Sequence, residues 1–128
     1  MKEHVQLTKA EVQRIDPDIL VTKYRPKAEI TIEDAREIDN AHITMSQGND
    51  MYIIADMTEG SATVTKEAEE YFVYKGKMIP YTKGVAIVTS SKSSIFSRLF
   101  GASTRTLYPT KEFTSVDDAR AWLDSIRE

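Results

Sequence analysis

The sequence contains no cysteine, and this absence excludes three kinds of structure. Disulfide-stapled folds, zinc ribbons and thiol nucleophiles all depend on cysteine. The sequence also lacks an apolar run of the roughly 18–20 residues that a membrane-spanning helix needs. Its first segment, MKEHVQLTKAEV, has no apolar core of the kind that a secretory signal carries. We therefore expect a cytoplasmic protein that does not insert stably into a membrane.

Histidine is scarce, and positive charge is not in excess. The two histidines, His4 and His42, have no acid or histidine at a helical spacing that makes a convincing metal site. No Gly-x-Ser-x-Gly sequence is present to support a serine nucleophile. The net charge is −3, with acids and bases interspersed, so the chain has no basic face for nucleic acid. The sequence predicts a protein that is not an enzyme, holds no cofactor or metal and binds no nucleic acid.

The residues that are present are typical of a globular domain. A chain of 128 residues with 41% hydrophobic and 29% charged residues is long enough to bury one core and too short for two. We therefore predict a single domain over residues 1–128.

Hydrophobic periodicity and turn residues predict an α/β fold. Residues 4–15 are predicted to form a strand, and Asp16–Asp18 supplies the turn to a second strand over 19–24, which makes a hairpin. Further helices are expected to begin near Thr31, Thr65, Ser93 and Ser115, and further strands at 51–55, 85–88 and 105–108. The predicted order is β-β-α-β-α-β-α-β-α. Strands that alternate with helices imply a mostly parallel mixed sheet, with the hairpin at one edge and four helices.

Asp56 and Thr58 follow the buried strand predicted over 51–55. The carboxyl ends of strands in open α/β sheets are where ligands bind, so both residues are candidates for a partner or ligand surface. A phosphoacceptor or magnesium-binding aspartate needs a second acid and a lysine nearby, which the sequence does not place there. The commoner role of such an aspartate is to accept backbone hydrogen bonds in the turn after the strand.

A second candidate surface is the hydroxyl-rich segment that precedes the third predicted helix. Ser93 and Ser94 lie at its amino end, where backbone N–H groups can hold an anion, although the segment lacks the glycines of a P-loop. An ordinary loop with a helix cap explains it equally well. In the helix itself, Phe96 and Phe100 share one face within Ile95–Phe100. That face either packs into the core or forms an exposed apolar surface for a protein or lipid.

The element order, together with YIIADMT, GVAIVT and YPTKEFTSVDDARAWL, resembles the STAS-like (anti-sigma-factor-antagonist-like) domains. The likeness covers nearly the whole chain. It looks strongest to a bacterial branch of unknown function, whose C-terminal pattern is matched here by Pro109-Thr110, Phe113, Asp118-Ala119 and Trp122-Leu123. The resemblance implies a STAS-like fold and a bacterial regulatory role.

The same resemblance implies a candidate phospho-switch. Classical members carry a phosphorylatable serine at the start of the helix after the central strand, and the matching place here is Ala62–Lys66. This chain has no serine-glycine pair there. Thr65 is the nearest hydroxyl and Thr63 the next. A helix cap is the alternative role of Thr65.

Two functions follow as hypotheses. The first is a non-catalytic bacterial regulatory module that binds a protein partner near residues 58–66 and 90–100. The second is a small-molecule or lipid-binding domain, with an apolar ligand in a pocket near the Ile95–Phe100 helix on the order of a few hundred Å³. Self-association stays open under either hypothesis, because an exposed edge of the N-terminal hairpin must be covered, charged or paired.

Overall fold

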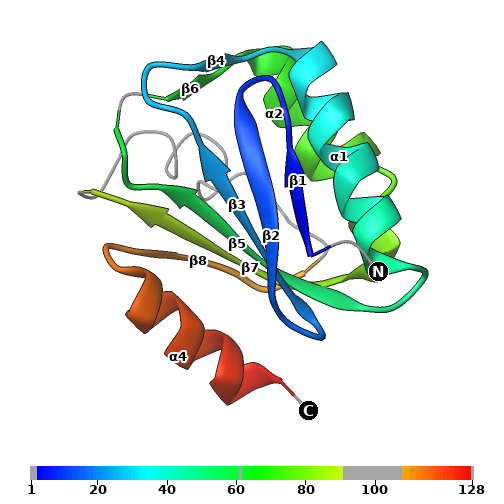
Figure 1. Cartoon of the computed structure of the whole chain (residues 1–128), viewed down its shortest axis with the longest axis vertical. Helices are drawn as coiled ribbons and strands as arrows, with labels where there is room; N and C mark the ends of the chain where they lie inside the picture. The colour runs from blue at the N-terminus through cyan, green and yellow to red at the C-terminus, as the bar shows by residue number, and fades with distance from the viewer. Residues whose placement is uncertain (1–2, 61, 91–107, 128) are drawn as a thin grey trace.

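The computed structural model describes residues 3–60, 62–90 and 108–127, and its main feature is a six-stranded sheet (Figure 1). The strands of this sheet are β1 (His4–Gln6), β2 (Ala10–Asp16), β3 (Ile19–Tyr24), β5 (Met51–Met57), β7 (Thr82–Thr89) and β8 (Thr110–Phe113). They lie in the order β1-β2-β3-β5-β7-β8. A separate two-stranded sheet pairs β4 (Glu29–Ile30) with β6 (Thr63–Val64) in parallel.

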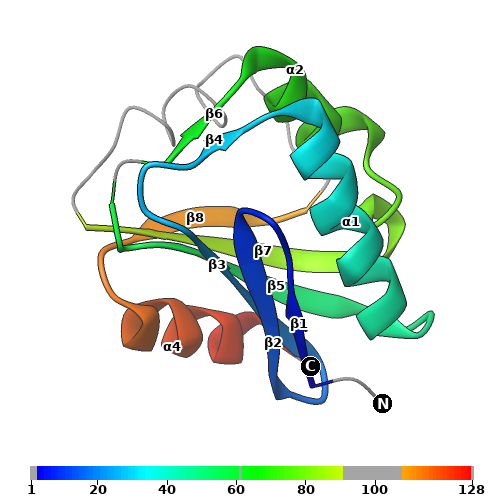
Figure 2. The ribbon, with the colours of Figure 1, turned by 45° about the horizontal axis from the view of Figure 1, so that its top comes forward.

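Helices cover both faces of the six-stranded sheet (Figure 2). The helices are α1 (Ile32–Ser46) and α2 (Lys66–Glu70) on one face, and α4 (Val116–Ile126) on the other. α2 continues directly into a π-helical turn, η1 (Tyr71–Lys75), and a 3₁₀ turn, η2 (Ile79–Tyr81), precedes β7. We call the two sides of the sheet the α1 face and the α4 face. Within the described ranges, no helix is long and apolar enough to cross a membrane.

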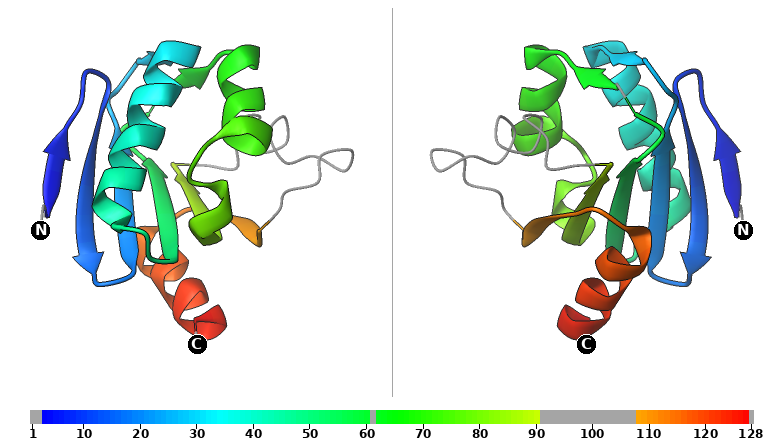
Figure 3. Two further views of the ribbon diagram at one scale, coloured as in Figure 1. Left: turned by 90° about the vertical axis from the view of Figure 1, so that its right-hand side faces the viewer. Right: turned by 90° about the vertical axis from the view of Figure 1, so that its left-hand side faces the viewer.

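The sheet is mixed and mostly parallel, as the sequence predicts. β3, β5, β7 and β8 pair in parallel, and β1 and β2 add antiparallel pairs next to β3. The two edges are β1 and β8, which lie on opposite sides of the molecule (Figure 3). β5 lies in the middle and is buried along most of its length, which explains its continuous apolar sequence.

Two helices begin at the capping residues that the sequence predicts. At α1, Thr31 Oγ1 accepts the backbone N–H of Asp34, and the Asp34 carboxylate accepts the N–H of Thr31 over 2.9 Å. This reciprocal pair satisfies two N–H groups that the first helical turn leaves without partners. At α4, Ser115 Oγ accepts the N–H of Asp118 over 3.1 Å.

The prediction of one strand over residues 4–15 is wrong, because this segment forms the separate strands β1 and β2. The N–H of Leu7 donates to the carbonyl of Ala10 over 2.8 Å and closes a tight turn. The guanidinium of Arg25 donates to the carbonyls of Thr8 and Leu7, over 3.1 and 3.3 Å. The turn contains neither glycine nor proline, and the side chain that holds it comes from beyond β3.

The strand predicted over 105–108 is also placed wrongly. β8 begins at Thr110, Tyr108 is not part of a strand, and residues 105–107 lie outside the described residues. Pro109 starts the pairing instead of ending it, because its carbonyl accepts the N–H of Val85 over 2.9 Å. Proline has no N–H to donate, so it is tolerated as the first residue of a strand.

The prediction of four helices is not reproduced in the described residues, which contain three α-helices. The third predicted helix, near residues 93–100, lies outside the described residues. The helix predicted from Thr65 is also shorter than its apolar period indicates. Its last turn widens into η1, and the N–H of Gly76 donates to the carbonyl of Tyr71 over 2.7 Å.

The α4 face is covered by a close-packed apolar cluster. Its buried members are Ile19, Tyr52, Ile54, Ala86, Val88, Ala119 and Leu123. Phe113 and Trp122 pack against this cluster with ring centroids 5.6 Å apart. The C-terminal sequence pattern therefore has a structural role, since it docks α4 onto the sheet.

Candidate functional site

Asp56 ends β5 and closes the turn that follows it. Its Oδ1 accepts the backbone N–H of Thr58 over 2.9 Å and the hydroxyl of Thr58 over 2.6 Å. The Asp56 side chain is buried, and Thr58 is half-buried. This is the turn-closing role that such aspartates commonly have. The pair stiffens the loop that leaves the carboxyl end of the central strand.

Thr63 and Thr65 lie further along the same loop and have different surroundings. Thr65 caps α2, because its Oγ1 accepts the N–H of Ala68 over 3.2 Å. Its own N–H donates to the carbonyl of Ile30 over 3.0 Å, which joins the loop to β4. Thr63 lies on β6 and its side chain is exposed. Of the two hydroxyls, that of Thr63 is the one that a modifying enzyme reaches without disturbing a helix cap.

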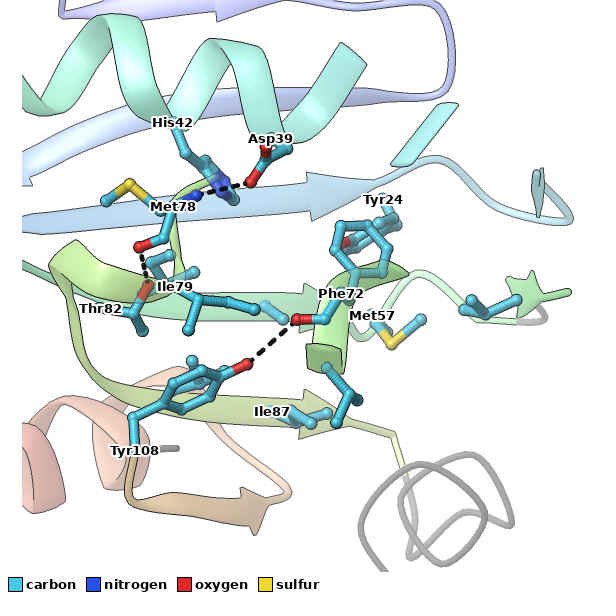
Figure 4. Close-up of a pocket in the computed structure, with 15 residues that line it drawn as sticks. Tyr24, Asp39, His42, Met57, Phe72, Met78, Ile79, Thr82, Ile87 and Tyr108 are labelled. Atoms are coloured by element: carbon cyan, nitrogen blue, oxygen red, sulfur yellow. Dashed lines mark hydrogen bonds between the residues drawn. The ribbon is translucent and has the colours of Figure 1, made fainter. Parts of the chain in front are cut away.

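Four other candidate residues, Ser93, Ser94, Phe96 and Phe100, lie outside the described residues. The pocket expected beside Ile95–Phe100 belongs to that same segment. The described residues form a different cavity, of about 100 Å³, on the α1 face of the sheet (Figure 4). Most of its residues come from α1, β3, β5, β6, β7 and the turns η1 and η2, and Met78 and Tyr108 lie outside these elements. The lining residues are Tyr24, Asp39, His42, Ile53, Ala55, Met57, Val64, Phe72, Val73, Met78, Ile79, Thr82, Val85, Ile87 and Tyr108.

Asp39 from α1 is the most heavily bonded polar group of this cavity. Only 3% of the residue is exposed. Its carboxylate accepts the Tyr71 hydroxyl over 3.1 Å and the backbone N–H groups of Lys77 and Met78 over 2.8 and 3.0 Å. Three hydrogen bonds compensate a buried carboxylate, since each donor replaces water that the charge loses on burial. Asp39 therefore ties α1 to the segment that enters η2.

His42 lies one helical turn after Asp39 and contacts β3. Its Nε2 lies 2.6 Å from Oγ1 of Thr22, and both residues are buried. Burial lowers the pKa of His42 to about 4, although the nearby Asp39 carboxylate acts in the opposite direction. The imidazole is therefore neutral at physiological pH. The described residues contain no group of three or more His, Cys, Asp or Glu side chains that could hold a metal ion.

Tyrosine hydroxyls border the cavity at two further points. Tyr108 donates to the carbonyl of Phe72 over 3.5 Å, and burial raises its pKa to about 12. Tyr24 on β3 is only 8% exposed, and no hydrogen bond of its hydroxyl to another described residue is present. Burial raises the pKa of Tyr24 as well, so its hydroxyl stays protonated. Figure 4 shows Tyr24 and Phe72 at one end of the cavity, and Asp39 and His42 toward the other.

Sequence reasoning missed the Asp39–His42 pair, although the two residues are three positions apart. The buried side of α1 includes Ile38 and Met45, and His42 lies between them in the sequence and is buried as well. A histidine on an apolar stripe, with an acid one turn earlier, is the signal that points to a buried polar wall. The expectation about His42 concerned metal ligands and did not address a structural role beside Asp39.

Comparison with known proteins supports the fold. The model of a family of domains of unknown function, DUF7793, matches residues 13–127. Among solved structures, the chain is similar to an uncharacterized protein of the DUF3478 family with a SpoIIAA-like fold from Shewanella loihica PV-4. The TM-score is 0.60 at 20% identity, over 89% of this chain and 91% of that chain. This likeness shows a SpoIIAA-like fold, which supports the STAS-like architecture expected from the sequence. No curated protein matches the chain.

Proposed function

We propose that this chain, which belongs to the DUF7793 family of domains of unknown function, is a non-catalytic bacterial regulatory module that binds a protein partner. The SpoIIAA-like fold of the similar structure supports a module of this kind. The binding surface that we assign to it lies on the outer side of the helix formed by α2 and η1.

The observation that carries this proposal is the exposure of Tyr74. It is 59% exposed, and no other large hydrophobic side chain is exposed in the described part of the chain. Lys66, Glu67 and Glu70 are also exposed and share its side of the helix at intervals of three to four residues. We call these four residues the Tyr74 face. An aromatic anchor within a charged rim is typical of a protein interface, where tyrosine often contributes most of the binding energy.

We expect phosphorylation of Thr63 to regulate binding at the Tyr74 face. Thr63 is exposed and lies just before α2, whereas the Thr65 hydroxyl is occupied as a helix cap. A phosphate on Thr63 adds roughly −1.5 to −2 charge at neutral pH. That charge would lie close in sequence to Glu67, so we expect it to weaken binding of an acidic partner and strengthen that of a basic one. Thr65 is the alternative site, and its modification would in addition remove the cap of α2.

Site-specific photocrosslinking tests the proposal. A photoreactive phenylalanine analogue replaces Tyr74 in the full chain, and the matched control replaces the exposed Asp117 on α4. We expect a discrete protein adduct from position 74 that position 117 does not give. With that partner purified, Tyr74→Ala should lower the affinity about 10- to 30-fold, as a truncated aromatic anchor does, and Asp117→Ala should leave it unchanged. No adduct from position 74, or equal affinity for the two variants, would overturn the proposal.

A further inference from the structure

We propose that the cavity on the α1 face binds a small, neutral, ring-sized molecule that accepts a hydrogen bond from the hydroxyl of Tyr24. This site is separate from the Tyr74 face and does not depend on the protein-binding proposal. Three observations support it: the size and lining of the cavity, the state of the polar groups around it, and its position relative to the surface.

The size of the cavity limits its occupant. Its volume is about 100 Å³, and apolar side chains such as Ile53, Met57 and Ile87 form most of its lining. A dry, apolar engineered cavity of about 150 Å³ binds benzene. A space of this order admits one ring or a few heavy atoms. A lipid acyl chain or a ligand of ordinary drug size does not fit wholly inside it.

The polar groups of the cavity select a neutral ligand with one acceptor. The Asp39 carboxylate already accepts three hydrogen bonds, Thr82 donates to the carbonyl of Met78 over 2.9 Å, and His42 pairs with Thr22. The hydroxyl of Tyr24 is the exception, because it has no such bond to a described residue although the side chain is more than nine-tenths buried. A ligand oxygen in the cavity can therefore accept a hydrogen bond from this hydroxyl, a bond that no described residue accepts.

The charged groups around the cavity also favour a neutral ligand. No described cation is among the residues that line the cavity, and His42 is neutral at physiological pH. An anionic ligand would face the Asp39 carboxylate without a counter-charge. A cation would lose its hydration and find Asp39 already occupied by three donors. A neutral hydroxyl or carbonyl compound avoids both penalties.

A route to solvent lies beside η2. A surface hollow of about 370 Å³ shares Ile79, Thr82 and Tyr108 with the cavity, and Pro80, Lys83 and Pro109 line the rest of it. The shared side chains form the wall between cavity and hollow. Ile79 and Tyr108 are only half-buried, so a change of rotamer there suffices to admit a small molecule.

Titration with two matched probes, phenol and benzene, tests this site in the full chain. The probes share the ring, and only phenol has an oxygen. We expect methyl signals of Met57 and Ile87 to shift saturably in NMR spectra, with phenol binding about tenfold tighter than benzene because of the additional hydrogen bond. Equal affinity for the two probes, or shifts confined to residues outside the cavity, would overturn the proposal. So would the absence of saturable shifts with either probe.

Two variants separate the hydrogen bond from the space. Tyr24→Phe keeps the ring and removes the hydroxyl. Benzene should bind this variant as it binds the wild type, and phenol should bind it with about the same affinity as benzene. Ala55→Val adds bulk from β5 into the cavity and should abolish saturable shifts with both probes. Unchanged preference in Tyr24→Phe would refute the assigned donor. Unchanged binding in Ala55→Val would refute the assigned cavity, provided that its spectrum shows the native fold.

Discussion

The two faces of the sheet are built in opposite ways. On the α4 face, Ile54 and Val88 pack against Ala119 and Leu123 in a close-packed apolar layer. On the α1 face, Asp39 and His42 are buried among apolar residues beside a cavity of about 100 Å³. Close packing gives the first face stability. The second face gives up some of that packing and buries polar groups beside its cavity.

The largest expected loss of stability comes from substitution of Asp39, a buried polar residue of the α1 face. Asp39→Ala removes three hydrogen bonds and leaves two backbone N–H groups and the Tyr71 hydroxyl without their acceptor. Because hydrogen bonds to a charged group are strong and their donors are buried, we expect a loss of about 4 kcal/mol of unfolding free energy in urea denaturation. Asp39→Asn, which keeps one carbonyl oxygen, should lose about half as much. A loss below about 1 kcal/mol for the alanine variant would show that Asp39 is not a structural centre of this face.

The α4 face should lose slightly less unfolding free energy when one of its buried side chains is truncated. Leu123→Ala removes a fully buried side chain from the cluster under α4. The lost burial and the space left behind should lower the unfolding free energy by about 3 kcal/mol in the same urea experiment. Ile126→Ala, at a half-buried position on the same helix, is the matched control and should cost less. Equal losses of unfolding free energy in Leu123→Ala and Ile126→Ala would contradict the idea that the buried cluster under α4 stabilises this face.

Acid should weaken the α1 face through His42. Its pKa is about 4 in the folded protein and about 6.5 in the unfolded chain, so the unfolded state binds the proton more readily. The stabilisation is complete above about pH 6.5 and is lost as the pH falls toward 4. The expected loss of unfolding free energy is about 2 kcal/mol between about pH 7 and about pH 4.5.

The His42→Gln variant isolates this contribution. Carboxylates such as Asp34 also lose stabilisation in acid. Burial raises the pKa of Asp34, but the Lys9 ammonium and the hydrogen bonds of Thr31 outweigh this effect and lower the pKa overall. The difference between the wild-type and variant pH profiles removes the share of these carboxylates. Identical slopes for the two proteins over this range would rule out His42 as the origin of the acid sensitivity.

The smallest effect tests how tightly α4 is packed. A Cβ added at Gly84 would lie 3.0 Å from Cδ1 of Ile126 and 3.2 Å from a ring carbon of Tyr52. Ile126 is near the end of α4 and can shift, so Gly84→Ala should cost only about 1 kcal/mol in thermal or urea unfolding. An increase in stability would show that α4 is more loosely packed than the close contacts at Gly84 indicate.

Local sequence signals predict the parts of this fold that depend on neighbouring residues. The cap at Thr31 and the apolar run of β5 have their cause within a few positions, and both are present as expected. The turn after Leu7 depends on Arg25, whose guanidinium comes from beyond β3. Such a contact has no signal in the turn itself, which is why the first strand was predicted to be too long.

The candidate site was harder to predict than the fold for the same reason. Asp39 finds its three donors 32 to 39 positions later in the chain, and Thr22 lies 20 positions before His42. Periodicity indicates which face of a helix is buried, but it does not show which polar group from another element meets that face. That the hydroxyl of Tyr24 has no hydrogen bond to a described residue can be found only from the three-dimensional arrangement of its neighbours.

The arrangement of α4 also has a consequence for biosynthesis. This helix follows every strand of the sheet in the chain and provides the helical cover of the α4 face. While a ribosome is still making residues 116–126, Ile54 and Val88 have no helix to pack against. The nascent sheet therefore exposes an apolar surface until α4 emerges, and exposed surface of this kind favours aggregation.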